Sequence, residues 1–127
     1  MSFKRERPWG WYSCLCRGDG FAVKKLYVAP NQRLSLQYHQ HREEHWTVVK
    51  GSGIVTQNEC TTECKPGDTF HIGIEQRHRL QGGDEGCLII EVQRGICKED
   101  DIIRIEDDYG RIQRKNIYAT INEYGTD

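Results

Sequence analysis

Histidines are concentrated in one region of the chain. Of the five histidines, four lie in the segment 31–51 or on the strand expected to pair with it. If this segment is extended, Gln37, His39 and His41 project from the same face, because side chains alternate along a strand. Such a row inside a small barrel is costly unless it is hydrogen-bonded or bound to a metal. Imidazoles near a carboxylate suit a divalent first-row metal without selecting one sharply.

The elements that must position these side chains are strands. Short runs rich in β-branched and aromatic residues alternate with turn residues through most of the chain. We predict strands at 21–28, 33–39, 44–50, 53–57, 69–72 and 87–93, with turns at 29–31, 50–53, 65–68 and 81–84. No amphipathic helical window precedes residue 98. Strands at intervals of about ten residues indicate an all-β sandwich or barrel.

Composition indicates one domain and excludes several classes of protein. The chain of 127 residues has room for a single core. Lys and Arg total 18 and Asp and Glu total 19, so no basic excess supports nucleic-acid binding. No apolar run approaches the roughly 18 residues of a membrane span, and the first residues lack the apolar stretch of a signal peptide. We therefore expect a soluble cytoplasmic protein that binds neither nucleic acid nor membrane.

The cysteines and the charged C-terminal stretch predict nothing beyond structure. In a reducing cytosol the six cysteines are expected to be small buried hydrophobes, with Cys14 and Cys16 paired on one face of a strand. Cys60 and Cys64 lack a second Cys/His pair at zinc-finger spacing. Residues 98–111 predict a solvated connection containing one short strand or helical turn.

The spacing of the polar residues resembles the two motifs of the cupin superfamily. The first motif, G-x5-HxH-x4-E-x6-G, lies over Asn31, Gln37, His39, Glu44 and Gly51. The second motif, G-x5-P-x-G-x2-H-x3-N, lies over Gly67, Gly73, Glu75, His78 and Gly82. The spacing holds throughout, whereas five residues depart from the motifs: Asn31, Gln37, Gly73, Glu75 and Gly82.

A narrower resemblance covers residues 7–111. Six ordered motifs are similar to the type II mannose-6-phosphate isomerase domain, the C-terminal cupin of bifunctional mannose-1-phosphate guanylyltransferase/mannose-6-phosphate isomerases. They are Arg7–Gly10; Arg33–Gln37; His41-Arg42 with Glu44–Trp46; Gly67-Asp68 with His78-Arg79; Glu91–Gln93 with Gly95; and Glu99–Arg104 with Asp108–Arg111. The chain has no Gly-rich phosphate loop, so we expect no GTP chemistry from it.

The resemblance implies a single cupin domain over residues 1–127, an all-β, double-stranded β-helix barrel of the jelly-roll type. Its core motifs would lie at 31–51 and 67–82, with a polar C-terminal extension at 98–127. The implied activity is a metal-dependent aldose–ketose isomerase that interconverts mannose 6-phosphate and fructose 6-phosphate and feeds GDP-mannose and polysaccharide synthesis. The implied partners are a small phosphorylated sugar and a second copy of the chain in a homodimer.

The resemblance also implies a cofactor and a set of ligands. One divalent metal ion is expected, zinc first, with manganese, cobalt, nickel and iron as alternatives. Its expected ligands are Gln37, His39, Glu44 and His78. A rival set replaces Gln37 with His41 and Glu44 with His45. In the alternative interpretation, His41 and His45 only orient the ligands.

The remaining site residues follow from the needs of the implied reaction. It requires a Lewis acid, a group that moves a proton between C2 and C1, and cations for the phosphate. Glu91 and Arg104 are the expected catalytic residues, although Glu91 also fits a role as a hydrogen-bond acceptor beside Gln93. The expected substrate-binding residues are His41, Arg42, Arg79 and Arg111, with Lys50 as a further phosphate candidate. His71 is expected to be packed, and Trp9, Trp11 and Trp46 to lie in the core or a dimer interface, with sugar stacking as the alternative.

Two other classes of function stay open at this point. The departures at Gly73, Glu75 and Gly82 favour a non-catalytic or regulatory sugar-binding cupin, because a protein can keep its fold after its catalytic activity is lost. A histidine-rich site with an open position also suits a metal-dependent oxygenase. The arginines and the isomerase-like motifs count against the oxygenase.

Overall fold

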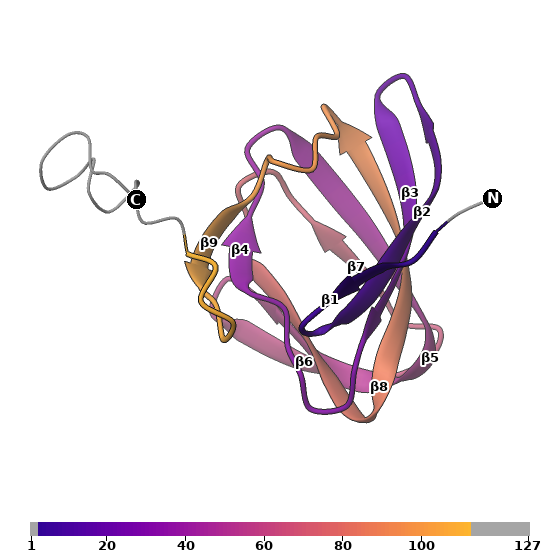
Figure 1. The fold of residues 1–127 in the computed structure, drawn as a ribbon, viewed down its shortest axis with the longest axis vertical. Coiled ribbons are helices and arrows are strands. Elements are labelled where there is room, and N and C mark those ends of the chain that lie inside the picture. Colours follow the sequence, from indigo (N-terminus) through magenta and orange to yellow (C-terminus); the bar gives the residue numbers. More distant parts are fainter. Residues whose placement is uncertain (1–2, 113–127) are drawn as a thin grey trace, which may run out of the picture.

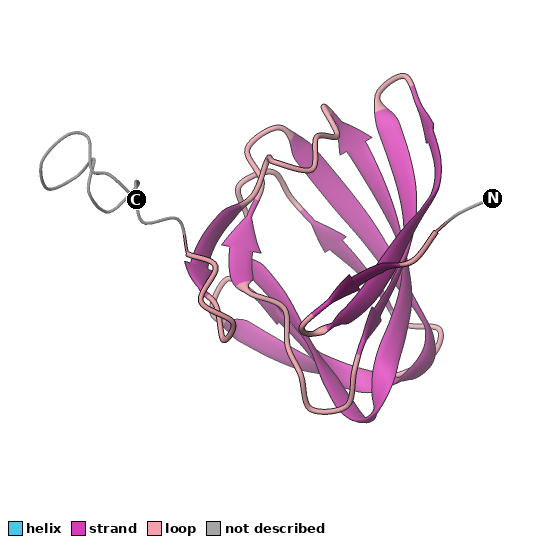
Figure 2. Ribbon diagram, in the orientation of Figure 1, coloured by secondary structure: helices cyan, strands magenta, loops and turns pink. Residues whose placement is uncertain are grey.

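The computed structural model describes residues 3–112 as strands joined by turns and loops, with no helix in that range (Figure 2). The tail at 113–127, part of the predicted C-terminal extension, lies outside the described residues. The strands are β1 Arg5–Arg7, β2 Gly10–Gly18, β3 Phe21–Val28, β4 Leu36–Tyr38, β5 Arg42–Gln57, β6 Cys60–Cys64, β7 Thr69–Ile72, β8 His78–Gly95 and β9 Ile103–Glu106. This part of the chain contains no helix long and apolar enough to cross a membrane.

The strands form one antiparallel sheet that curls around a common interior (Figure 1). The sheet order is β1-β2-β3-β8-β4-β9, and β5 pairs with β6, β7 and β8. The two longest strands, β5 with 16 residues and β8 with 18, pair with each other along most of their length. The predicted all-β barrel is therefore confirmed.

Several predicted boundaries were wrong. The turn predicted at 50–53 is an irregularity inside the continuous strand β5, where the register shifts and Gly51 takes a φ of 82°. Of the strand predicted at 33–39, only residues 36–38 form a regular strand, β4. Arg33 forms an isolated bridge with Gln81 outside that strand. Cys14 and Cys16 are half-buried and exposed rather than a buried pair, since the β2–β3 register shifts between them. The short strand expected in 98–111 is β9.

The inner faces of β3, β5 and β8 each change from polar to apolar along the strand. On β5 the buried side chains run from Arg42 and Glu44 to Trp46 and Val48. The same change runs from Lys24 to Leu26 and Val28 on β3, and from Gln93 and Glu91 to Ile89 on β8. Antiparallel pairing aligns the polar ends of the three strands. One end of the interior is thus an apolar core, where each large buried side chain contributes about 1.5–3 kcal/mol, and the other end is polar.

Candidate metal and substrate site

Three potential metal ligands meet in the polar end of the barrel. His39 follows β4, Glu44 lies on β5 and His78 begins β8, and all three are buried. The Nε2 atom of His39 lies 3.1 Å from Glu44 Oε2, and the Nε2 atom of His78 lies 3.9 Å from Glu44 Oε1. One donor atom from each residue lies within 4.8 Å of the others. The structure therefore brings together three of the four ligands that the sequence predicts.

Both imidazoles are oriented for ligation. His39 Nδ1 lies 2.7 Å from the backbone oxygen of Asp101, and His78 Nδ1 lies 2.9 Å from that of Gln76. A carbonyl oxygen can only accept, so each ring donates from Nδ1–H and places Nε2 beside Glu44; Nε2 of His39 also lies 3.3 Å from Arg42 Nη2. Burial, with a smaller contribution from His39, lowers the pKa of His78 to about 4 despite the charge of Glu44. A neutral ring of this kind suits a divalent cation.

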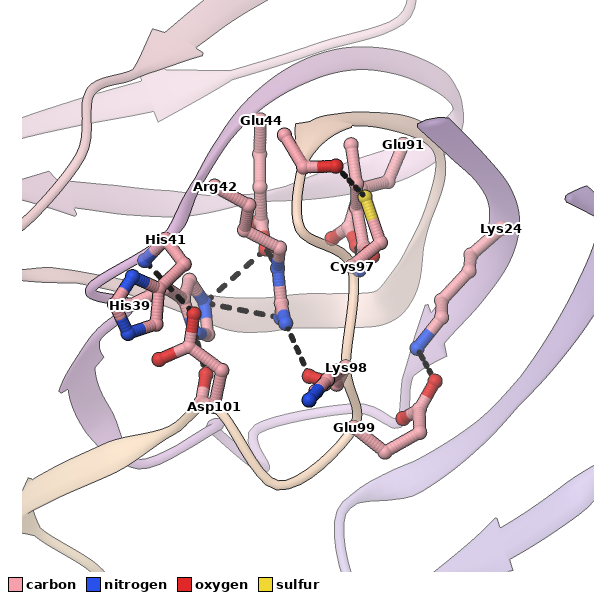
Figure 3. Close-up of polar contacts among 12 residues, drawn as sticks. Lys24, His39, His41, Arg42, Glu44, Glu91, Cys97, Lys98, Glu99 and Asp101 are labelled. Atoms are coloured by element: carbon pink, nitrogen blue, oxygen red, sulfur yellow. Dashed lines mark hydrogen bonds and ion pairs between the residues drawn. The ribbon is translucent and has the colours of Figure 1, made fainter. Parts of the chain in front are cut away.

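Glu44 is fixed by its neighbours on β5. Arg42 Nε donates to Glu44 Oε2 at 3.0 Å, and the indole N–H of Trp46 donates to Oε1 at 3.0 Å. Burial alone would raise the pKa of Glu44, but His39, His78 and Arg42 together hold it well below its usual value. Figure 3 shows Arg42, His39 and Glu44 pointing toward one another. The carboxylate is therefore charged and held beside both imidazoles, as a metal ligand must be.

Gln37 lies on the inner side of β4, in register with His78 on β8. Its amide nitrogen donates to the hydroxyl oxygen of Ser35 at 2.9 Å. The side-chain oxygen is thus the atom of Gln37 left for a cation, and an amide oxygen is an acceptable ligand for hard or borderline metals. The residues present fit a divalent metal ion with two nitrogen and two oxygen donors.

The loop after β8 contributes a residue that the sequence analysis did not select. The carboxylate of Asp101 accepts hydrogen bonds from the backbone N–H groups of Gln40 and His41, each at 2.9 Å. The same residue accepts the Nδ1 proton of His39 through its backbone oxygen. Asp101 therefore fixes both the turn after β4 and the ring of His39. The available signal was its position inside the family-like motif at 99–104.

Glu91 lies on the inner face of β8, between Ile89 and Gln93, and all three side chains are buried. The sequence predicts that these three residues share a face. The amide of Gln93 donates to Glu91 Oε2 at 2.7 Å. Burial, followed by the charge of Glu44, raises the pKa of Glu91 to about 8. Lys24, the register partner of Glu91 on β3, is buried and forms an ion pair with Glu99 from the loop after β8 (Figure 3).

A cavity of about 200 Å³ contains these groups and extends to a cluster of arginines. Arg7, Arg104 and Arg111 line it together with Gln37, His39, Glu44, His78 and Glu91. Within residues 3–112, the Nε atom of Arg104 is buried without a hydrogen-bond partner. Burial lowers the pKa of Arg104, and the positive charges of Arg111 and Arg7 add to this effect. A half-buried guanidinium with a buried, unpaired Nε–H and two cationic neighbours favours an anion.

Two predicted substrate ligands lie away from this cavity. His41 is exposed, because β4 ends at Tyr38 and the chain turns before the alternation reaches it. Arg79 is buried, but its guanidinium donates to the backbone oxygen of Leu34 and to Glu106. Arg42 does line the cavity, yet its nitrogens hold Glu44 and the backbone oxygen of Lys98. Arg42 therefore positions a ligand in this structure.

Other predicted residues take roles that the sequence did not resolve. His45 points outward from β5 and is exposed, so it does not join the buried ligands as the rival set required. His71 is also exposed, which makes the expectation of a packed histidine wrong. Trp9 and Trp46 are buried beside the cavity, whereas Trp11 is half-buried and stacks on Tyr27. Lys50 lies outside the cavity.

A curled antiparallel barrel with an inward-facing His, Glu and His set is the architecture of a cupin. A solved structure of a conserved protein with a double-stranded β-helix domain from Klebsiella pneumoniae has the same fold. It superimposes with a TM-score of 0.66 at 22% identity, over 75% of this chain and 83% of that one.

The sequence comparison places the chain more narrowly. It belongs to the family described as mannose-6-phosphate isomerase, C-terminal, whose model matches residues 1–107. It is 47% identical over 107 residues to the alginate biosynthesis protein AlgA of Pseudomonas aeruginosa, covering 83% of this chain and 22% of that protein. It is 39% identical over 108 residues to the mannose-1-phosphate guanylyltransferase ManC of Salmonella typhimurium, covering 84% and 22%. The chain spans less than a quarter of the length of the curated relatives that it matches first.

Proposed function

We propose that the chain is a metal-dependent aldose–ketose isomerase that interconverts mannose 6-phosphate and fructose 6-phosphate. The observation that carries this proposal is one cavity lined both by metal-ligand side chains and by arginines. The first group is the buried His39, Glu44 and His78, and the second includes Arg104, whose Nε–H is unpaired within the described residues and which is in register with Gln37 on β4. A phosphorylated sugar offers hydroxyl and carbonyl oxygens to the first group and a phosphate to the second.

The proposed metal ligands supply electrophilic assistance. A divalent metal held by His39, Glu44, His78 and the oxygen of Gln37 would act as a Lewis acid on the oxygens at C1 and C2 of the sugar. Arg42 and Trp46 hold the Glu44 carboxylate in place. Fixed ligands preserve the geometry of the site during turnover, because little reorganisation is then needed as charge develops.

Glu91 is the proposed group for proton transfer. The reaction moves the C2 proton of mannose 6-phosphate to C1 through an enediol, while the hydroxyl proton passes from O2 to O1. The Glu91 carboxylate would take the proton from C2 and return it to C1. Its raised pKa of about 8 makes it a stronger base than an exposed glutamate and an acid near neutral pH. Gln93 holds Glu91 Oε2 and leaves Oε1 for the substrate.

The arginine cluster is the proposed phosphate subsite. Arg104 would donate its unpaired Nε–H to a phosphate oxygen, and Arg7 and Arg111 would add positive charge beside it. Arg111 is itself held by two hydrogen bonds to Asp107, at 3.0 and 2.8 Å. A guanidinium fixed in this way keeps its charge in place without using rotamer entropy on binding.

The wider role follows the family. Proteins related to this chain are named for alginate biosynthesis and for mannose-1-phosphate guanylyltransferase activity. We propose that fructose 6-phosphate is converted here to the mannose 6-phosphate used for GDP-mannose and polysaccharide synthesis. Zinc as the metal, a homodimer and a cytoplasmic location stay predictions from the sequence.

The test is turnover by metal-stripped protein after separate addition of zinc, manganese or cobalt. A coupled assay would follow the interconversion of mannose 6-phosphate and fructose 6-phosphate. We expect turnover that depends on the metal and is lost in His39→Gln and His78→Gln. The matched control is His41→Gln, which changes an exposed imidazole only two residues from His39 and should retain activity.

The outcome also separates the isomerase from the sugar-binding alternative. Folded protein that binds mannose 6-phosphate but gives no turnover with any of the three metals would contradict the isomerase and favour a non-catalytic cupin. Melting curves of the two histidine variants would establish that they are folded.

A further inference from the structure

A second group of ligand-type side chains lies on the outer face of the barrel. Glu43 and His45 lie two residues apart on β5, and His71 lies on β7. His45 and His71 are direct partners in the antiparallel register between these strands. Because side chains two residues apart on a strand share a face, all three project to the same side. Glu44 lies between the first two and points inward to the candidate metal site.

The donor atoms of this outer cluster converge on one point. His45 Nε2 and His71 Nε2 each lie 2.9 Å from the same oxygen, Oε1 of Glu43. The two imidazole rings are 4.7 Å apart between centroids. One ligand atom from each residue lies within 4.8 Å of the others. Two nitrogens and one carboxylate oxygen thus face a common centre.

We propose that Glu43, His45 and His71 form a second binding site for a first-row divalent metal ion. Two ligands about 2.0–2.1 Å from a tetrahedral zinc ion are about 3.3 Å apart, so each imidazole has to move outward by only about 0.4 Å. Each neutral ring then carries its proton on Nδ1 and offers Nε2 to the metal. Two histidines and one carboxylate are a common ligand set for zinc, and water completes the coordination.

The backbone around this outer site is fixed, which reduces the entropy lost on binding. β5 is paired on both sides at this position, since His45 is in register with His71 on β7 and with Val92 on β8. The side chains remain accessible: those of His45 and His71 are 47% and 57% exposed. A metal can therefore enter from solvent without any opening of the barrel.

One nearby cation opposes binding. Arg94 is the register partner of Glu43 on β8, and its Nη1 atom lies 3.9 Å from Glu43 Oε2. This side chain is 66% exposed and can turn toward solvent. We expect Arg94→Gln to tighten metal binding, because it removes a positive charge that competes for the same carboxylate.

The test is the zinc stoichiometry of the purified chain, measured by isothermal titration calorimetry after removal of bound metal. We expect wild type to bind two zinc ions per chain and His45→Gln/His71→Gln to lose one of them. The control variant His41→Gln, which removes a third exposed imidazole, should retain both.

Two results would overturn the proposal. One is a His45→Gln/His71→Gln protein that binds as many zinc ions as wild type. The other is a wild-type protein that binds one zinc ion, which is lost in His39→Gln/His78→Gln. The inner and outer sites are lost in different variants, so failure of this proposal is distinguishable from failure of the proposed isomerase. If the inner variant fails to fold, the comparison of wild type with the outer variant still decides.

Discussion

His39 Nδ1 donates a 2.7 Å hydrogen bond to the backbone oxygen of Asp101, a residue 62 positions later in the chain. The same Asp101 holds the backbone of Gln40 and His41 with its carboxylate. The loop between β8 and β9 therefore determines the orientation of an imidazole in the candidate metal site. Residues that orient metal ligands in this way typically contribute about 10–100-fold to metal affinity.

Removal of the Asp101 carboxylate should weaken the inner metal site. Asp101→Ala frees the turn at 40–41 that positions His39, so we expect zinc affinity to fall by about tenfold or more. Asp101→Asn keeps one acceptor oxygen, so its zinc affinity should lie between those of wild type and Asp101→Ala. Asp100→Ala, an exposed neighbour, is the control. A calorimetric zinc titration in the His45→Gln/His71→Gln background measures the inner site alone. Equal zinc affinities with and without Asp101→Ala in that background would contradict the positioning role of Asp101.

Gly82 explains one departure from the cupin motif, and it predicts a difference in stability. A Cβ atom at this position would lie 2.4 Å from the backbone oxygen of Ala29 and 2.7 Å from that of Val28. The motif's asparagine is thus excluded unless the backbone moves. We expect Gly82→Ala to lower the free energy of unfolding by about 1–3 kcal/mol.

Gly73 supplies the matched control for that substitution. A Cβ atom there meets no atom within 4 Å, so Gly73→Ala should leave the unfolding free energy nearly unchanged. Urea denaturation of both variants measures the difference. Two equally stable variants would show that the close backbone approach at Gly82 does not exist in solution.

Glu91 should make the metal-free protein less stable as the pH rises. Its pKa is about 8 in the folded protein, against an ordinary glutamate pKa of 4.5 in the unfolded chain. Between these values the folded state keeps a proton that the unfolded state releases, so the free energy of unfolding falls by up to about 1.4 kcal/mol per pH unit. Below about pH 4.5 both states are protonated, and the penalty is absent.

The corresponding variant is Glu91→Gln, whose side chain is neutral throughout this range, so its free energy of unfolding should depend less on pH. Urea denaturation in the presence of a chelator, from pH 5 to pH 8, measures this dependence. The control Glu59→Gln changes an exposed carboxylate and should retain the wild-type slope. Identical slopes for Glu91→Gln and wild type would show that Glu91 is already charged in the folded protein.

Arg104 should determine the affinity for phosphate. Its unpaired Nε–H would gain a charge-assisted hydrogen bond, worth about 1.5–3 kcal/mol. We therefore expect Arg104→Ala to weaken the binding of inorganic phosphate by about tenfold or more and to raise the KM for mannose 6-phosphate. Arg104→Lys keeps the charge and should be affected less. Calorimetry measures the phosphate affinity of each variant, with Arg77→Ala as the exposed control. Unchanged phosphate affinity in Arg104→Ala would place the phosphate elsewhere.

Local sequence pattern predicted much of the fold and the inward direction of several residues that line the cavity. Alternation along β5 placed Glu44 and Trp46 on one face, and alternation along β8 did the same for Glu91 and Gln93. The set of His39, Glu44 and His78 came from the resemblance to the cupin motifs, and the structure places these three side chains together.

The errors arise where contacts between distant segments override alternation. His41 was expected inside because the strand was expected to continue, but the turn bound by Asp101 directs it outward. At the start of β8, His78, Arg79 and Leu80 are all buried, since β9 and the segment before β4 cover the second face. The pairing of His45 with His71 depends on the register between β5 and β7, which no local pattern specifies.

The most direct test of the central proposal is isomerisation in deuterium oxide by the zinc-loaded chain. If Glu91 carries the proton between C2 and C1 and that proton exchanges with solvent before it is returned, deuterium enters at C2 of mannose 6-phosphate and at C1 of fructose 6-phosphate. Proton NMR detects this even at slow turnover. We expect incorporation in wild type and none in Glu91→Gln or in metal-free protein. Recovery of mannose 6-phosphate that is neither labelled nor converted to fructose 6-phosphate, from folded, zinc-loaded wild type, would contradict the proposed isomerase.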